Sequence, residues 1–339
     1  MVEMPPPPPS SIPPPADDAA EFRELEQLAA AGHHRAVLDG LARLPAGMRE
    51  GRTRAALLAA EAHGRLGEHD AAVRWADLAQ TLARARGEAH AELRARNYHG
   101  LIALRHGDIA DAERHFSAAL EMARALRDHA TEARCLNNLG ILANIRGEPD
   151  AALASYRLAL VAYQQVGHVR GIAETYHNIG ISLRDQGNAR AAVGAAEEAV
   201  RLAAQAGDEQ LAALAATGRA ELHVILGDPA FAGAELKQAA DRYARIGFRA
   251  GLPEVWRVQA AVARARGDRT EAVSLLADAA HAAAEYGSTD TLADIERDLS
   301  LSLDAVGDSA GARAARDRAV ALYRKIGATR AAERLVSSH

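Results

Sequence analysis

Glycine recurs every forty residues through most of the chain, at Gly67, Gly107, Gly147, Gly187, Gly227, Gly267 and Gly307. A second series, with Arg127 in the place of one missing member, falls at Gly87, Gly167, Gly207, Gly247, Gly287 and Gly327. Glycine readily adopts the left-handed conformation that ends a helix, and Asp, Glu or Asn follows each glycine of the first series. The spacing therefore predicts units of two helices, with one turn inside each unit and another between units.

Small residues keep the same phase as the glycines. Alanine occupies the fifth and the twelfth position after every glycine of the first series, and Ala, Gly or Ser stands seven positions before it. Two helices approach closely only where the facing side chains are small. These columns predict a helix–helix contact within each unit and an all-α fold.

The composition favours a helical array over several compact cores. Only 4% of the residues are aromatic, and about a quarter are alanine, the best helix former. No apolar stretch approaches the roughly 18 residues that a membrane span needs. The first residues lack the basic and apolar regions of a signal peptide, and Cys135 is the one cysteine, so we expect a soluble, cytoplasmic protein.

The net charge of −5 provides no electrostatic footprint for nucleic acid, which usually calls for a strongly basic face. Neither nucleic acid nor a membrane is therefore an expected partner. The 38 arginines against two lysines, together with the alanine content, indicate the coding bias of a GC-rich genome.

Two segments carry a family resemblance. LNNLG (136–140) precedes Gly147, which is followed by Ala152, Tyr156 and Ala159, and YHNIG (176–180) precedes Gly187 in the same way. These segments resemble the tetratricopeptide repeat (TPR), whose usual period is 34 residues. The resemblance implies a right-handed α-solenoid of stacked antiparallel helix pairs. It covers 53–332 as seven units: 53–92, 93–132, 133–172, 173–212, 213–252, 253–292 and 293–332. Forty-residue units are similar to those of LGN/Pins-type adaptors and of bacterial TPR sensor arrays.

The segments outside the repeats differ from them in composition. Residues 1–16 hold eight of the twelve prolines and predict an extended tail, which is either a flexible leader or a docking strip for a proline-binding domain. Residues 17–52 predict a divergent N-terminal pair of helices, stopped by Pro45, that caps the first unit. At the other end, the helix 316–326 and the short stretch after it are the predicted cap, and 333–339 form a C-terminal tail.

The first helices of stacked TPRs line a concave groove, and here one face of them carries amides, arginines and aliphatic residues. Amides both donate to and accept from a peptide backbone, and Arg can clamp a carboxylate. The family resemblance implies that Asn138 and Asn178 hold the backbone of a ligand. The alternative is an ordinary solvated helix face. The predicted groove residues are Arg94, Asn97, Tyr98, Leu101, Arg105, Arg134, Asn137, Asn138, Ile141, Asn144, Glu174, His177, Asn178, Ile181 and Arg184.

Charge changes along the predicted groove. Its first half is basic, through residues such as Arg94 and Arg134, whereas its last half is mixed to acidic, through Glu221, Glu254, Asp294, Asp298 and Asp304. We therefore hypothesise that an acidic or C-terminal carboxylate-bearing segment of a partner protein docks in units two to four.

No set of residues predicts catalysis or a cofactor. His99, His106 and His115 are close in the sequence, but no carboxylate or cysteine completes a metal-ligand set. Nucleotide-binding, hydrolase and metalloprotease motifs do not occur. Cys135 is predicted to be a small buried residue, and packing between units explains Tyr163, Tyr243 and Tyr323.

Two functions fit these features. The first is a non-enzymatic scaffold or adaptor that binds a peptide or helical segment of another protein in the groove. The second is a regulatory sensor, whose curvature responds to a peptide or small ligand and controls a separate effector. The protein is expected to be a monomer, or a homodimer formed through an end unit.

Overall fold

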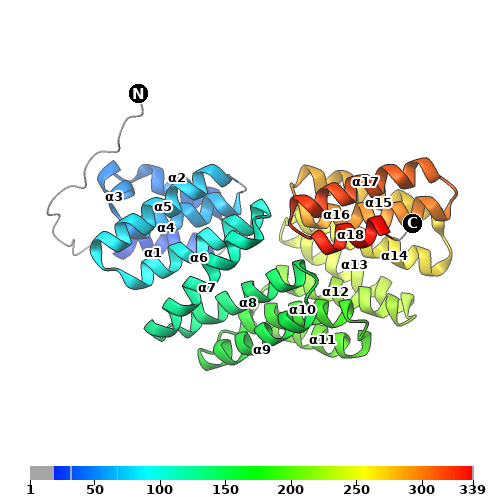
Figure 1. The fold of residues 1–339 in the computed structure, drawn as a ribbon, viewed down its shortest axis with the longest axis horizontal. Helices are drawn as coiled ribbons and strands as arrows, with labels where there is room; N and C mark the ends of the chain where they lie inside the picture. The colour runs from blue at the N-terminus through cyan, green and yellow to red at the C-terminus, as the bar shows by residue number, and fades with distance from the viewer. Residues whose placement is uncertain (1–18, 31–32, 67, 338–339) are drawn as a thin grey trace. The chain divides into compact units, whose positions relative to one another are not determined.

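The computed structural model describes residues 19–30, 33–66 and 68–337, so the predicted Pro-rich tail of residues 1–16 lies outside it. The described residues form eighteen α-helices and one 3₁₀ helix, without a strand, and the predicted solenoid of antiparallel helix pairs is confirmed (Figure 1). The helices are α1 (Ala19–Ala30), α2 (His34–Arg43), α3 (Ala46–Gly51), α4 (Thr53–Arg65), α5 (His69–Arg86), α6 (Ala89–His106), α7 (Ile109–Leu126), α8 (His129–Ile145), α9 (Pro149–Gln165), α10 (Val169–Asp185), α11 (Ala189–Gln205), α12 (Glu209–Ile225), α13 (Pro229–Arg245), η1 (Arg249–Gly251), α14 (Leu252–Arg266), α15 (Arg269–Glu285), α16 (Thr289–Ala305), α17 (Ser309–Lys325) and α18 (Thr329–Ser337).

The chain divides into two compact units within α6, between Ala95 and Arg96. In the first unit, Phe22 of α1 and Leu58 of α4 belong to one hydrophobic core, to which α2 also contributes. The segment before α4 holds three helices rather than the predicted two. α2 ends before Pro45 as expected, but Pro45 then precedes the short helix α3, because proline fits the start of a helix.

The second unit stacks helix pairs in which each first helix contacts the first helix of the next pair. These contacts join α8 to α10, α10 to α12, α12 to α14 and α14 to α16. Among the described residues no comparable contact joins successive second helices, α9, α11, α13, α15 and α17. Since helices on the inside of a curved stack lie closer together, we call the face formed by α8, α10, α12, α14 and α16 the inner wall.

The turns follow the two glycine series. Every described glycine of both series has a positive φ, from +64° to +89°, while Gly67 lies outside the described residues. Arg127, in the place of the missing glycine, has a φ of 55°. The residue after a turn often caps the next helix, as where Asp108 Oδ1 accepts from the Asp111 N–H at 3.0 Å. The predicted turn chemistry is therefore confirmed.

Replacing Arg127 with Gly is expected to raise the free energy of unfolding by about 1 kcal/mol, because it removes the steric cost of a left-handed side chain. Arg127 is exposed, so little packing is lost. Urea denaturation measures the change. The matched control Arg157→Gly, inside the exposed face of α9, should instead lower stability by about 1 kcal/mol. Equal effects of the two changes would contradict the prediction.

The small-residue columns form the contact between the two helices of each pair. In two pairs a glycine of the first helix lies against an aromatic ring of the second, Gly100 against Phe116 and Gly140 against Tyr156. The alanine columns after the turns have no exposed surface at the described positions from 72 to 312 and from 79 to 319. The predicted close approach is confirmed.

Within the second unit, the end of α17 and the helix α18 contact the turns that follow α6 and α8. The Gly107 backbone, after α6, lies against the Lys325 carbonyl at the end of α17 so closely that no side chain fits at this glycine. Arg330 of α18 donates to the Gly147 carbonyl at 2.9 Å, and Ile145 packs against the C-terminal hydrophobic cluster. The repeat period does not predict this contact between distant repeats, because stacked repeats ordinarily contact only their neighbours.

Candidate functional site

Amide side chains link the first helices of three consecutive repeats. Asn138 Nδ2 donates to Asn97 Oδ1 at 3.4 Å, and Asn178 Nδ2 donates to Asn137 Oδ1 at 3.2 Å. The two residues of each pair are 41 positions apart, one repeat plus one residue. The hydrogen bonds therefore connect neighbouring repeats, and we call this row of side chains the amide ladder.

Most of the amide ladder is buried. Asn97, Asn137 and Asn138 expose only 7%, 8% and 9% of their surface. Buried amides need hydrogen-bond partners, so these side chains hold the repeats in register as well as lining the wall. Asn144 and Asn178 are only partly buried and remain more accessible to a ligand.

The predicted groove residues belong to both compact units and differ in burial. Arg94 lies in the first unit, and the other fourteen lie in the second. Leu101 and Ile141 pack against hydrophobic clusters, and Glu174 forms an ion pair with Arg170 on its own helix at 3.2 Å. The others range from partly buried to exposed: Tyr98, Ile181 and Arg184 are partly buried, and Arg105 and Arg134 are exposed.

A small pocket opens between α10, α11 and α12, and its volume of about 260 Å³ includes open solvent outside the enclosed part. Burial, assisted by the nearby Arg184 guanidinium, lowers the pKa of His177 in its lining to about 4, against the smaller opposing effect of Glu221. The imidazole is therefore neutral at physiological pH, with one donor and one acceptor nitrogen. The pocket is lined by His177, Gly180, Ile181, Arg184, Ala196, Gly218, Glu221 and Leu222.

The low pKa of His177 predicts a pH-dependent stability. Protonation is easier in the unfolded chain, near pH 6.5, than in the folded chain, near pH 4. The stabilisation from the neutral ring is thus complete above pH 6.5 and is lost as the pH falls to 4. Urea denaturation across this range should show wild type losing stability relative to His177→Gln. His281→Gln, at an exposed position on α15, should run parallel to wild type, and a parallel His177→Gln curve would contradict the prediction.

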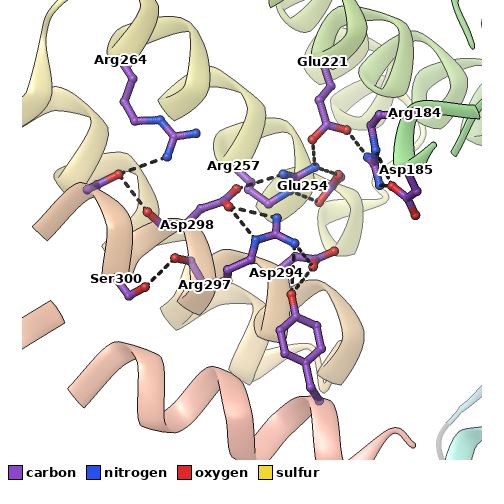
Figure 2. A network of polar contacts seen from close by, with 12 residues as sticks. Arg184, Asp185, Glu221, Glu254, Arg257, Arg264, Asp294, Arg297, Asp298 and Ser300 are labelled. Carbon is purple, nitrogen blue, oxygen red and sulfur yellow. Dashed lines mark hydrogen bonds and ion pairs between the residues drawn. The ribbon is translucent and has the colours of Figure 1, made fainter. Parts of the chain in front are cut away.

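Ion pairs replace amides in the C-terminal half of the inner wall (Figure 2). The Arg257 side chain, only 4% exposed, lies at the centre of this ion network. It donates to Asp298 at 3.0 Å, to Glu221 at 2.8 Å and to Glu254 at 2.7 and 2.9 Å. Arg184 binds the other oxygen of Glu221. The network therefore connects α10, α12, α14 and α16.

The charges of the ion network set the protonation of its carboxyls. Burial alone would raise the pKa of Glu221, but the guanidiniums of Arg257 and Arg184 outweigh it and lower the pKa to about 2. The pKa of Asp298 is lowered too, because Arg297 and Arg257 outweigh its burial. Burial raises the pKa of Glu254, with only Arg257 to oppose it. The predicted acidic half of the groove is therefore largely neutralised by its own arginines.

Sequence reasoning did not single out Arg257, although a signal for it exists. Arg257 stands at the same position of its repeat as Asn97 and Asn137, and Asp298 at the same position as Asn138. The shared offset of 41 residues identifies the contact once one example of it is known. Cys135 is fully buried as predicted, and burial raises the pKa of its thiol to about 12, so the thiol is unreactive.

Residues 92–165 match the family model of the tetratricopeptide repeat. This segment therefore consists of tetratricopeptide repeats. The matched segment contains the amides Asn97, Asn137 and Asn138 of the ladder. No curated protein matches the sequence, and the similarity of the TPR units to LGN/Pins-type adaptors stays a prediction.

Three solved structures share the fold over most of their length. The Rap conjugation gene regulator of plasmid pLS20, in complex with the Phr* peptide, is 13% identical, with a TM-score of 0.67 and coverage of 92% of this chain and 80% of the regulator. The apo quorum sensor NprR from B. thuringiensis is 12% identical, with a TM-score of 0.66 and coverage of 89% and 86%. Aspartyl phosphate phosphatase F from Bacillus subtilis is 12% identical, with a TM-score of 0.58 and coverage of 97% and 94%. At these identities the similarity is one of fold.

Two further properties bear on the choice of partner. None of the described helices is both long and apolar enough to cross a lipid bilayer. Within residues 19–30, 33–66 and 68–337, no group of three or more His, Cys, Asp and Glu side chains is placed to hold a metal ion. His99 and His115 instead stack on each other, with ring centroids 5.2 Å apart.

Proposed function

We propose that the inner wall of the second unit binds an extended peptide segment of a partner protein and that the protein acts without catalysis. The observation that carries this proposal is the amide ladder, which places amides of successive repeats along one face. An extended peptide presents backbone donors and acceptors along its length, and amides can satisfy both. Two of the structural neighbours, by their names, are a peptide complex and a quorum sensor, which supports the same class of function.

The charge distribution favours an acidic segment or a C-terminal carboxylate in the N-terminal half of this wall. Arg134 is exposed and takes part in none of the ion pairs found among the described residues. The carboxylates of the other half are already held by Arg257, Arg184 and Arg297. A ligand carboxylate therefore meets an uncommitted cation near Arg134, which can bind it in bidentate fashion.

The same ladder favours a sensor over a rigid scaffold. Its hydrogen bonds join separate repeats, and Ser182 of α10 donates in the same way to Asn144 of α8 at 2.8 Å. A ligand that takes over some of these hydrogen bonds changes the contact between neighbouring first helices. Binding then shifts the population of curvatures, which a separate effector protein can detect.

A library of short peptides with free α-carboxylates, immobilised at their N-termini, tests the binding proposal. For the best binder, Arg134→Glu should weaken binding by about tenfold and reduce its salt dependence. The control Arg157→Glu makes the same charge change on an exposed position of the second helix α9 and should leave the affinity unchanged. An equal loss of affinity in both variants, or an affinity that neither variant changes, would contradict the proposed site.

Two further measurements separate the alternatives. A change in the radius of gyration of the protein on peptide binding, measured by X-ray scattering, supports the sensor, and an unchanged radius supports the scaffold. Release of phosphate from a protein aspartyl phosphate would instead assign the activity for which phosphatase F is named and would overturn the non-catalytic proposal.

A further inference from the structure

The contact between successive first helices follows one rule along the inner wall. The fifth residue of each repeat meets the sixth residue of the next repeat, 41 positions later. The rule places Asn97 against Asn138 and Asn137 against Asn178. In the ion network it places Arg257 against Asp298 at 3.0 Å. Each of these three pairs forms a hydrogen bond between repeats, and we call every pair that the rule places together a rung.

One rung leaves a polar side chain without a hydrogen-bond partner among the described residues. At its place the fifth residue is His177 and the sixth residue of the next repeat is Gly218, whose ideal Cβ position lies 3.3 Å from His177 Cε1. Gly218 supplies no side chain, and His177 takes part in none of the hydrogen bonds found among the described residues. By contrast, the next rung pairs Thr217, which donates to the Ala213 carbonyl of its own helix, with the apolar Val258. The His177–Gly218 rung therefore packs a polar ring against a residue that offers no side-chain partner.

The His177 ring lines the pocket described above, and a second pair of small residues, Gly180 and Ala196, belongs to the same lining. In two other repeats the glycine of the first helix faces an aromatic ring, whereas Gly180 faces Ala196 and has no heavy atom nearer than 3.6 Å to its ideal Cβ position. One side of the pocket is closed by the Arg184–Glu221 ion pair. The enclosed part of the pocket has room for about one water molecule, and its mouth opens to solvent, so a ligand side chain reaches the ring from the mouth.

We propose that the mouth of this pocket binds the side-chain carboxamide of an Asn or Gln residue of the ligand, which completes the missing rung of the amide ladder. A neutral imidazole offers one donor and one acceptor, and a carboxamide presents the matching acceptor and donor. The complete rungs at Asn138 and Asn178 use this same chemical group. A carboxylate ligand is disfavoured by the Glu221 side chain in the lining, and a cation by Arg184. The inference rests on the proposed function, since it names one side chain of the peptide.

Acetamide, a free carboxamide, is the first probe, and it needs no knowledge of the peptide. In protein labelled with ¹⁵N at histidine, the ring signals of His177, assigned by their loss in His177→Gln, should shift saturably with acetamide. Sodium acetate should give no saturable shift. In Gly218→Asn, which supplies the missing amide from the chain itself, the response to acetamide should disappear. The matched control Gly194→Asn, on the exposed face of α11 with no neighbour near the glycine, should keep it.

Three outcomes would overturn the inference: a His177 shift that grows linearly, one that acetate reproduces, or one that survives in Gly218→Asn. If Gly218→Asn is unstable, the comparison of acetamide with acetate on the wild-type chain still decides. For a peptide found in the library screen, replacing its Asn or Gln with Leu should weaken binding to wild type by about tenfold and to Gly218→Asn much less. A library without any binder refutes the proposed function, whereas the acetamide result concerns the pocket alone.

Discussion

Replacing Arg257 with Met is expected to lower the free energy of unfolding by about 3–5 kcal/mol at pH 7, because buried carboxylates lose their shared partner. Arg257 is bound by Glu221, Glu254 and Asp298, and only the first and last of these have a second arginine. Glu254 would be left without a cation in a buried site. Urea denaturation at pH 7 measures the loss.

The pH dependence of this loss provides an internal check. At pH 5 the loss should be smaller, because an unpaired buried carboxylate accepts a proton and its charge disappears. Arg201→Met is the control: Arg201 pairs with Glu198 on the exposed face of α11, and its loss should leave the stability nearly unchanged. A loss of about 1 kcal/mol or less for Arg257→Met would show that the ion network does not hold these helices together.

Gly140→Ala is expected to lower the free energy of unfolding by about 2–3 kcal/mol, although alanine is the better helix former. The added methyl group would overlap the ring of Tyr156, whose Cδ1 lies 2.7 Å from the ideal Cβ position. The ring is fully buried, and its hydroxyl accepts a hydrogen bond from Asn144 Nδ2 at 3.2 Å. The ring therefore has no free direction in which to move. Thermal or urea unfolding measures the effect.

The chain offers both a control and a rescue for this prediction. Gly194 is a helical glycine with open space around it, so Gly194→Ala should raise stability by about 0.5–1 kcal/mol. In other repeats, Ala220 and Ala260 stand where Gly140 does, and the facing residue is leucine rather than an aromatic. Adding Tyr156→Leu to Gly140→Ala should accordingly recover most of the loss. A double variant no more stable than the single one would contradict the steric explanation.

The repeat architecture could be predicted from the sequence because it is encoded many times. Each helix end depends on one local conformation, and twelve described glycines share it. Even the exception, Arg127, adopts the same left-handed turn. Because packing fixes the helices on either side, the turn between them can adopt only one backbone conformation. Even an unfavourable residue therefore adopts it at an exposed position. The short helix α3 was missed, because it lies outside the period and carries no buried residue.

The inner wall was predicted less completely, for a geometric reason. Helical periodicity identifies which side chains share a face, but the offset between one repeat and the next depends on how the pairs stack. The sequence alone does not distinguish an amide that meets a ligand from one that meets an amide 41 residues away, as Asn97 meets Asn138. For the same reason, the carboxylates of the acidic half were predicted to be unpaired, because the partner of Asp298 lies in the preceding repeat.

The contact between Gly107 and Lys325 also changes how the second unit is expected to unfold. In an open array the terminal repeat has one interface only, and it frays first while the middle of the array stays folded. Here the C-terminal helices have a second interface with the turns at Gly107 and Gly147. Melting of α17 and α18 must therefore give up both interfaces at once, which removes the low-stability end of the array and makes the second unit unfold as a single cooperative block.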